Sequence, residues 1–120
     1  MAEHLHLGQK GETAALQYLI EQGYSIRAQN WKHGHLEVDL IANISDELVF
    51  VEVKTRSTDY FGHPAEAVTD SKKEHLYQAA EAYLEDEDED WECRFDVIAV
   101  IINSKGVEID HMPDAFGPEF

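Results

Sequence analysis

Two charged residues inside an apolar stretch are the clearest indication of chemistry in this sequence. Glu52 and Lys54 stand near the end of residues 48–56, a run rich in valine that is typical of a β-strand. Alternate side chains of a strand share one face, so both residues should lie on the face that begins with Leu48 and Phe50. That face begins apolar and ends charged, which predicts that the pair emerges where the core meets a cleft. A carboxylate there can hold a divalent cation, while the ammonium positions a water and stabilises charge on a reacting phosphate.

A second carboxylate is expected, because Mg²⁺ is usually held by one or two carboxylates together with water or substrate oxygens. Asp39 is the best candidate, on the face of the preceding predicted strand that also carries Glu37 and Ile41. A short turn at 43–47 would place Asp39 beside Glu52. The opposite face of the same strand is predicted to carry the apolar residues Leu36, Val38 and Leu40.

Glu12 is a third candidate, on an edge of the first predicted helix that leans toward the sheet. Each of these signals also has a purely structural explanation. A Glu-x-Lys pair on a strand is usually an exposed cross-strand ion pair, and a glutamate near a helix start is favoured by the helix dipole. Asp39 can equally belong to a polar strand face. The ordered combination of Glu12, Asp39, Glu52 and Lys54 on suitable elements is what favours a site.

Hydrophobic periodicity and turn residues predict the elements that position these side chains. Helices are expected at 7–22 and 70–84, and strands at 24–31, 36–42, 48–56, 94–102 and 107–111. A loop is expected at 58–64, an extra turn at 65–68 and an irregular tail at 112–120. The order α-β-β-β-α-β-β predicts a single α/β domain over residues 1–120, with a mixed β-sheet flanked by helices.

The chain is strongly acidic, which weighs against simple binding of nucleic acid. Its formal net charge is −16, and it has nine lysine and arginine residues in total. Part of the imbalance is local, because residues 85–92 contain seven acids and are predicted to form a solvated acidic loop. Four bases flank the candidate site, namely Lys54, Arg56, Lys72 and Lys73. The local charge can therefore differ in sign from the global charge.

Cysteine usage and the absence of targeting signals predict the compartment. Cys93 is the only cysteine, which excludes an intramolecular disulfide and favours a reduced compartment. The first residues lack the basic flank and apolar stretch of a secretion signal, and no apolar run approaches the roughly 20 residues that span a bilayer. A cytoplasmic protein without a membrane partner is expected.

Two further features are expected to be structural. The histidine pairs at 4–6 and 33–35 have no third ligand at the spacing of a zinc site, so scattered surface histidines are predicted. Asp96 lies in an apolar strand, where a buried acid needs a partner. Arg94 lies on the same face, which favours a structural ion pair over a role in the site.

The candidate residues also belong to a wider set of positions by which the chain resembles the YraN-type uncharacterised bacterial family. The similarity extends over residues 7–100 and is most specific in the run Phe-Val-Glu-Val-Lys at 50–54. The matching positions are Gly8, Gly11, Glu12, Ala15, Tyr18, Leu19, Gly23, Tyr24, Asn30, Trp31, residues 37–42 and 48–56, Phe61, Gly62, Pro64, Ala67, Val68, Lys72, Ala80, Tyr83, Leu84 and residues 94–98.

This family is regarded as having the restriction-endonuclease-like fold, akin to Holliday-junction resolvases. The resemblance therefore implies a metal-side set, a catalytic lysine, and Mg²⁺ or Mn²⁺ as the cofactor. The metal-side set is Glu12, Asp39, Glu52 and the carbonyl of Val53, and the lysine is Lys54.

Two hypotheses follow. The first is a metal-dependent endonuclease acting on DNA, with branched or single-stranded forms as substrates and a homodimer where two strands are cut symmetrically. The second is a non-catalytic binding or scaffold module of the same fold that serves, with a protein partner, in DNA processing. The acidic composition favours the second hypothesis, as do Glu74 and His75, which stand where the family tends to be basic.

Overall fold

The computed structural model describes residues 2–58, 67–87 and 90–118. The elements follow one another as α1 (Ala2–Glu21), β1 (Ser25–His33), β2 (Leu36–Ile44), β3 (Glu47–Arg56), α2 (Asp70–Glu85), β4 (Glu92–Asn103) and β5 (Gly106–Phe116). The predicted order α-β-β-β-α-β-β and the α/β class with a mixed sheet are confirmed. Within the described ranges, neither helix combines the length and the apolar character that crossing a membrane requires.

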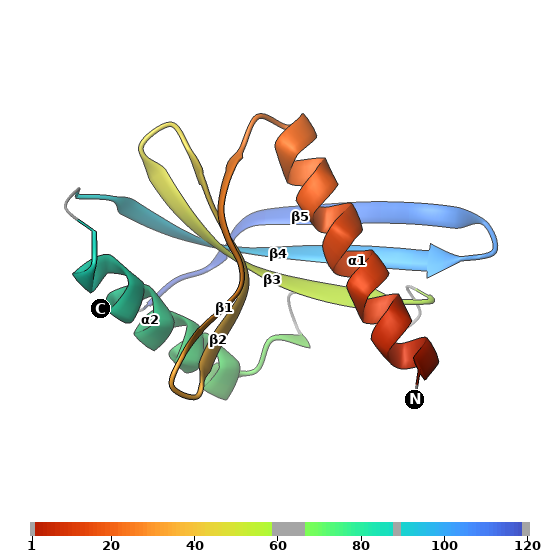
Figure 1. The fold of residues 1–120 in the computed structure, drawn as a ribbon, viewed down its shortest axis with the longest axis horizontal. Coiled ribbons are helices and arrows are strands. Elements are labelled where there is room, and N and C mark those ends of the chain that lie inside the picture. The colour runs from red at the N-terminus through yellow and green to blue at the C-terminus, as the bar shows by residue number, and fades with distance from the viewer. Residues whose placement is uncertain (1, 59–66, 88–89, 119–120) are drawn as a thin grey trace.

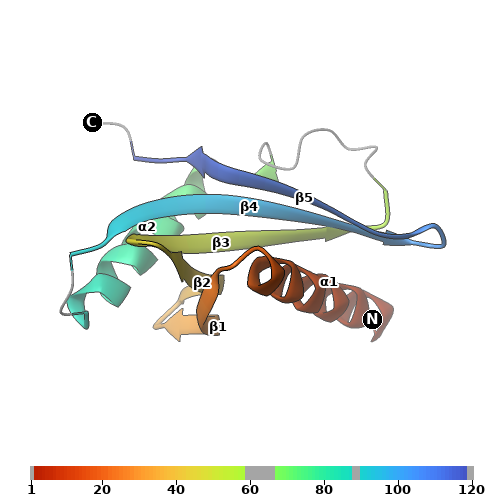
Figure 2. The same ribbon diagram turned by 90° about the horizontal axis from the view of Figure 1, so that it is seen from above.

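The strands form one sheet in the order β1-β2-β3-β4-β5 (Figure 1). Neighbouring strands are antiparallel except β3 and β4, which run parallel. A parallel pair needs a crossover connection, and α2 lies in the segment that joins these two strands. Helix α1 crosses one face of the sheet and α2 covers the other, as Figures 1 and 2 show together.

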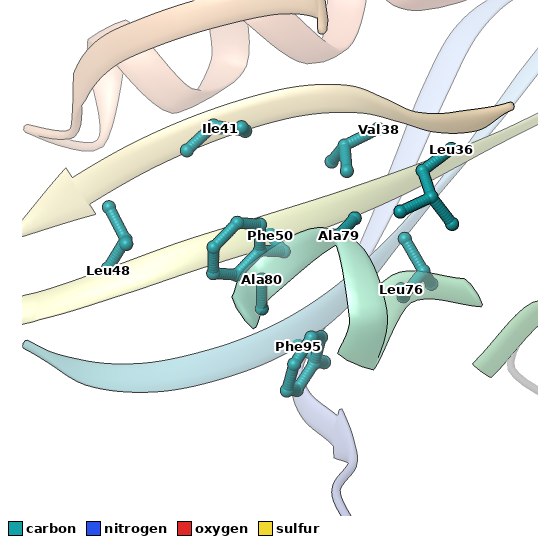
Figure 3. Packing of buried hydrophobic residues seen from close by; sticks show 9 residues of the cluster. All are labelled: Leu36, Val38, Ile41, Leu48, Phe50, Leu76, Ala79, Ala80 and Phe95. Atoms are coloured by element: carbon teal, nitrogen blue, oxygen red, sulfur yellow. The ribbon is translucent and has the colours of Figure 1, made fainter. Parts of the chain in front are cut away.

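The side chains of β3 alternate between two cores, one beneath each helix. Leu48 and Phe50 point into the core beneath α2, which also contains Leu76 (Figure 3). Val49 and Val51 point into the core beneath α1. The predicted faces of this strand are therefore confirmed, and its charged end continues on the α2 side. Burying a side chain of this size contributes about 1.5–3 kcal/mol, so the alternation fixes the register of β3.

Helix α1 lies against β3 at Gly11. A Cβ added to Gly11 would overlap the side chain of Thr55, so a residue with a side chain there would push the helix away from the sheet. Glu12 is the next residue along the helix, so the close packing of Gly11 on Thr55 keeps the backbone of Glu12 near the sheet.

Strand β2 departs from strict alternation, and here the prediction was wrong. Val38 and Ile41 both lie in the core beneath α2, whereas Leu40 lies in the core beneath α1. The alternation therefore changes around Asp39. The neighbouring strand is irregular at the same level, because Asn30 of β1 has a left-handed backbone with φ of 49°. Asp39 is therefore the residue at which the alternation of β2 between the two faces of the sheet changes.

Strand β5 is longer than predicted, and the irregular tail expected at 112–120 is wrong up to residue 116. The pairing passes through a bulge that contains Pro113 and Asp114, the latter with φ of 50°. A proline usually ends strand pairing because it has no backbone N–H to donate. A bulge residue is left out of the ladder, so Pro113 can be accommodated there. Pairing then resumes between Phe116 and Phe95, whose rings stack with centroids 5.8 Å apart.

Some predicted features fall outside the described residues. These are most of the loop at 58–64, the first half of the turn at 65–68, and residues 88–89 of the acidic loop. Within the described part of that loop, Glu87 accepts a hydrogen bond of 2.6 Å from Arg27. At least one of its acids is therefore paired rather than only solvated.

Candidate functional site

Glu52 is a nearly buried carboxylate at the charged end of β3, only 7% exposed. Lys54 Nζ lies 3.9 Å from Glu52 Oε1, and Lys72 Nζ of α2 lies 3.6 Å from Oε2. Oε2 is buried, and none of the described residues donates a hydrogen bond to it. Burial and the negative charge of Asp39 raise the pKa of Glu52 to about 7, although the two lysines act in the opposite direction. Two ion pairs, with Lys54 and Lys72, are thus the contacts that the described residues make with this carboxylate.

Asp39 is fixed by the backbone of the strand that carries Glu52. Its Oδ2 accepts a hydrogen bond of 2.8 Å from the backbone N–H of Val53. The β2–β3 ladder ends at the pair Leu40–Val51, so the Asp39 carboxylate replaces the acceptor that a continuing strand would supply. Burial raises the pKa of Asp39, while the Val53 hydrogen bond lowers it. The N–H and C=O of a strand residue point to the same edge, so the Val53 carbonyl faces Asp39 as well.

Glu12 on α1 is the third acid of the candidate set, and the charge of Asp39 acts on Glu12 as it does on Glu52. Burial is the main cause that raises the pKa of Glu12, and the charge of Asp39 raises it further. Glu52, however, points away from α1, because that helix packs on the opposite face of β3. The described residues contain no group of three His, Cys, Asp or Glu placed to hold a metal ion. The three acids therefore do not form a closed set of metal ligands. Asp39 and Glu52 are the two that form the centre of the candidate site.

The sequence identified Lys54 as a site residue but treated Lys72 only as a flanking base. Lys72 is the third residue after Thr69, the N-cap of α2, and its charge reaches Glu52 from the helix that covers this face. A positive charge in the first turn of a helix is opposed by the helix dipole. That unfavourable position is the signal by which the sequence could have revealed a second lysine of the site.

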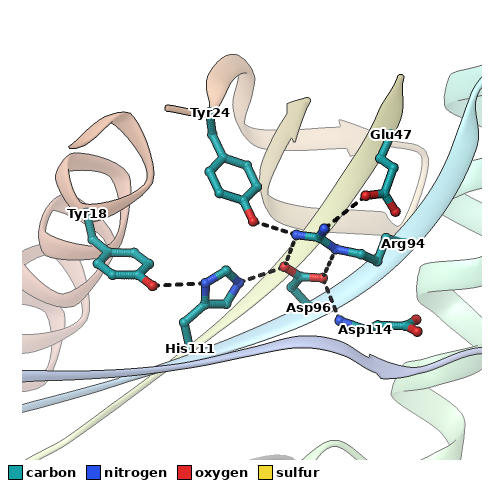
Figure 4. Close-up of polar contacts among 7 residues, drawn as sticks. All are labelled: Tyr18, Tyr24, Glu47, Arg94, Asp96, His111 and Asp114. Atoms are coloured by element: carbon teal, nitrogen blue, oxygen red, sulfur yellow. Dashed lines mark hydrogen bonds and ion pairs between the residues drawn. The ribbon is translucent and has the colours of Figure 1, made fainter. Parts of the chain in front are cut away.

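Asp96 of β4 is the other buried acid of the sheet, and it is completely inaccessible (Figure 4). Arg94 donates two hydrogen bonds of 2.8 Å to its carboxylate, one from Nε and one from Nη2. His111 Nε2 lies 2.7 Å from Oδ2, and the backbone N–H of Asp114 donates to Oδ1 at 3.0 Å. Burial raises the pKa of Asp96, but these hydrogen bonds outweigh it and bring the pKa below its usual value.

The partners of Asp96 are themselves held from several elements. Arg94 Nη2 donates to the Tyr24 hydroxyl at 2.6 Å, and Nη1 lies 3.2 Å from Glu47 Oε1. His111 Nδ1 lies 3.1 Å from the hydroxyl of Tyr18 on α1. The predicted Arg94–Asp96 ion pair is therefore present as part of a larger network. His111 and Tyr18 were missed because both are distant from Asp96 in the sequence.

The two regions offer different chemistry. The Asp96 network satisfies its charges internally, which is what a structural role requires. The Glu52 region instead combines two carboxylates and a strand carbonyl with two ammonium groups that reach solvent, the side chains of Lys54 and Lys72 being 28% and 34% exposed. Such a set can present oxygen ligands to a hard cation and positive charge to a phosphate.

Comparison with known proteins places the candidate residues inside a recognised family region. A family model described as "Uncharacterised protein family UPF0102" matches residues 11–100. A UPF0102 protein of Bacteroides thetaiotaomicron is 48% identical over 118 residues, which covers 98% of both chains. UPF0102 proteins of Christiangramia forsetii and Chlorobaculum parvum are each 44% identical, over 97% and 92% of this chain and 98% and 91% of their own.

Proposed function

The chain belongs to the uncharacterised protein family UPF0102, and we propose that it is a metal-dependent endonuclease of the restriction-endonuclease-like kind that hydrolyses DNA phosphodiester bonds. The observation that carries this proposal is the buried Oε2 of Glu52, which no described residue hydrogen-bonds. A buried polar atom left unsatisfied costs about 1–3 kcal/mol, and more when it is charged. A ligand oxygen kept free for a cation accounts for that cost.

The donor set fits Mg²⁺ or Mn²⁺. Both cations prefer oxygen ligands, which the carboxylates of Asp39 and Glu52 and the Val53 carbonyl supply. Mg²⁺ keeps several waters or substrate oxygens, so two carboxylates are sufficient without a third direct ligand. Glu12 would then act on a cation-bound water rather than on the cation itself. The bound cation would polarise the phosphate and lower the pKa of an attacking water.

The protein's own residues would orient the substrate and stabilise charge. Hydrolysis forms a bond from a water oxygen to phosphorus and breaks one P–O ester bond, so negative charge grows on the phosphoryl oxygens. Lys54 supplies a positive charge for that stage. The Val53 N–H holds Asp39 in one orientation. Glu52 must be ionised to bind a cation, and because burial raises its pKa to about 7, cation binding should release a proton near neutral pH.

The test is cleavage of labelled single-stranded, duplex, flap and four-way-junction DNA at low salt with Mg²⁺ or Mn²⁺. Wild type is compared with Asp39→Asn, Glu52→Gln and Lys54→Met. Glu108→Gln and Lys105→Met make the same chemical changes at exposed positions of the β4–β5 hairpin and serve as matched controls. Cleavage by wild type and both controls, with loss in the three site variants, is expected. Cleavage that survives Glu52→Gln in protein free of host nucleases would contradict the proposal.

The alternative is a non-catalytic module of the same fold that binds DNA or a protein partner in DNA processing. One observation favours it: the formal net charge of −16 leaves few positive groups outside the site to hold a long duplex. In the same assay it predicts binding without cleavage on every substrate, with all proteins shown to be folded.

A further inference from the structure

Lys72 contacts Glu52 without being fixed by it. The 3.6 Å between Lys72 Nζ and Glu52 Oε2 is an ion-pair distance that is too long for an N–H···O hydrogen bond. Among the described residues, this contact leaves the ammonium hydrogens able to meet another acceptor, and with 34% of the Lys72 side chain exposed, a ligand in solvent can reach them.

The backbone that carries Lys72 is, by contrast, firmly held. Thr69 Oγ1 accepts a hydrogen bond of 3.1 Å from the Lys72 N–H, and the Thr69 carbonyl accepts one of 2.9 Å from Lys73. One turn later Leu76 is fully buried beneath the helix. The flexible side chain of Lys72 is therefore attached to a firmly held backbone at the edge of the site.

The adjacent lysine points elsewhere. Lys73 Nζ lies 5.4 Å from the centre of the Phe116 ring on β5, whereas Lys54 and Lys72 are the described ion-pair partners of Glu52. Lys72 and Lys73 have the same side chain, sit on the same helical turn and differ in what they contact. Lys73 is for this reason a matched control for any effect of removing a positive charge from the start of α2.

We propose that Lys72 is a phosphate-positioning residue that exchanges partners, pairing with Glu52 when no cation is bound and with a DNA phosphate when the cation is bound. This inference rests on the proposed function. A divalent cation at Glu52 Oε2 repels an ammonium group at this separation, so the two compete for the same oxygen. The displaced ammonium, carried on its firmly held backbone, then turns to the phosphate that the cation also contacts.

Cation affinity without DNA gives the first test. Mn²⁺ binding, measured by electron paramagnetic resonance or calorimetry, should tighten at least about threefold in Lys72→Met, since a competing charge is removed. Lys73→Met should bind Mn²⁺ like wild type, and Lys72→Arg should not show the tightening. Equal Mn²⁺ affinity in Lys72→Met and Lys73→Met would overturn the exchange of partners.

DNA affinity without divalent cation gives the second test, in the opposite direction. Glu52→Gln should bind a short DNA duplex more tightly than wild type, because Lys72 loses its anionic partner. The double variant Glu52→Gln/Lys72→Met should lose that gain, and the slope of log affinity against log salt should fall by about one phosphate contact. Lys73→Met in the same background should retain the gain in affinity. A gain that persists in the double variant would show only relief of repulsion by Glu52 and would overturn the proposal.

These outcomes separate failure of the inference from failure of the proposed function. Wild type that binds Mn²⁺ and cleaves DNA, with Lys72→Met indistinguishable from Lys73→Met, removes Lys72 alone. Wild type that binds no Mn²⁺ and cleaves no DNA removes the nuclease proposal together with it. A merely structural role for Lys72 would weaken cation and DNA binding together, whereas partner exchange moves them in opposite directions.

Discussion

Glu52 and Asp96 are buried acids on adjacent, parallel strands, yet their surroundings are opposite. Asp96 accepts four hydrogen bonds, and these bring its pKa below the usual value. Glu52 has two lysines at ion-pair distance, and one oxygen to which no described residue donates. Burial dominates there, and the pKa of Glu52 rises to about 7.

Burial alone therefore does not separate an acid held in a structural network from an acid left open to a ligand. Both residues lie near the middle of the sheet, and both are less than 10% exposed. What separates them is whether the fold supplies donors for each carboxylate oxygen. The fold supplies donors to Asp96 on one strand and leaves Oε2 of Glu52 without one among the described residues on the next. Each of the following experiments tests whether that contrast reflects the ligand role proposed for Glu52.

The largest effect is expected on cleavage. Glu52→Gln should lower the rate of DNA cleavage by at least about 1,000-fold, equivalent to about 4 kcal/mol of transition-state stabilisation. Asp96→Asn, assayed at a temperature where it is folded, should cleave at nearly the wild-type rate per folded molecule. Loss of cleavage in both variants would break the contrast.

The free energy of unfolding should be affected in the reverse order, with Asp96→Asn more damaging than Glu52→Gln. Asp96→Asn should lower the free energy of unfolding by about 3 kcal/mol, because it removes the fully buried carboxylate that Arg94 contacts most closely and leaves Arg94 with only the partly exposed Glu47 as a counter-charge. Urea denaturation measures the change, and Asp110→Asn on an exposed position of β5 is the matched control. A wild-type midpoint in Asp96→Asn would show that the network contributes little.

Glu52→Gln should instead stabilise the metal-free protein, by about 3 kcal/mol at pH 8, which corresponds to the rise of the Glu52 pKa from 4.5 to about 7. Burial raises the folded-state pKa of Glu52, so at pH 8 the folded protein must hold an ionised carboxylate that is more stable in the unfolded chain. Denaturation without divalent cation tests this. Destabilisation by Glu52→Gln would mean that the two lysines compensate the burial fully.

The pH dependence should also differ in sign. The folded state keeps the Glu52 proton up to a pKa of about 7, so this residue's contribution to stability falls as the pH rises from about 4.5 to 7. Asp96 contributes stability that is present above its unfolded pKa and lost as the pH falls through its lower folded pKa. Stability profiles of Glu52→Gln and Asp96→Asn should lose the neutral and the acid slope respectively. A profile of Glu52→Gln that parallels wild type from pH 4.5 to 7 would refute the assignment.

The smallest effect is expected from added cation. Mg²⁺ at a few times its dissociation constant should raise the unfolding free energy of wild type by about 1 kcal/mol and leave that of Glu52→Gln unchanged. Asp96→Asn should gain as much as wild type. Thermal melts with Mg²⁺ or EDTA measure the difference, and equal gains in all three proteins would indicate binding elsewhere.

Much of this architecture could be predicted because it depends on local periodicity. The alternation of Leu48, Val49, Phe50 and Val51 gave the faces of β3 and hence the direction of Glu52. The change of face around Asp39 could not be foreseen, since it arises where two strands are distorted together.

Features that depend on contacts between distant segments could not be predicted from the sequence either. Lys72 meets Glu52 only once α2 has packed on the sheet, and Pro113 in a bulge reads in sequence like the end of a strand. The metal-side roles of Glu12, Asp39, Glu52 and Val53 remain predictions from the resemblance and the proposed chemistry.

The span of the Asp96 network along the chain has a kinetic consequence. Tyr18 and His111 are separated by 93 positions, whereas Glu52, Lys54 and Lys72 lie within one strand–helix segment. Closing the longer loop costs more chain entropy, so the network should complete late in folding, after the site's own segment has formed. Substitutions at Asp96 should then act mainly by accelerating unfolding. The Asp96 network, on the face of the sheet opposite to Glu52, would thereby determine how long the folded site persists.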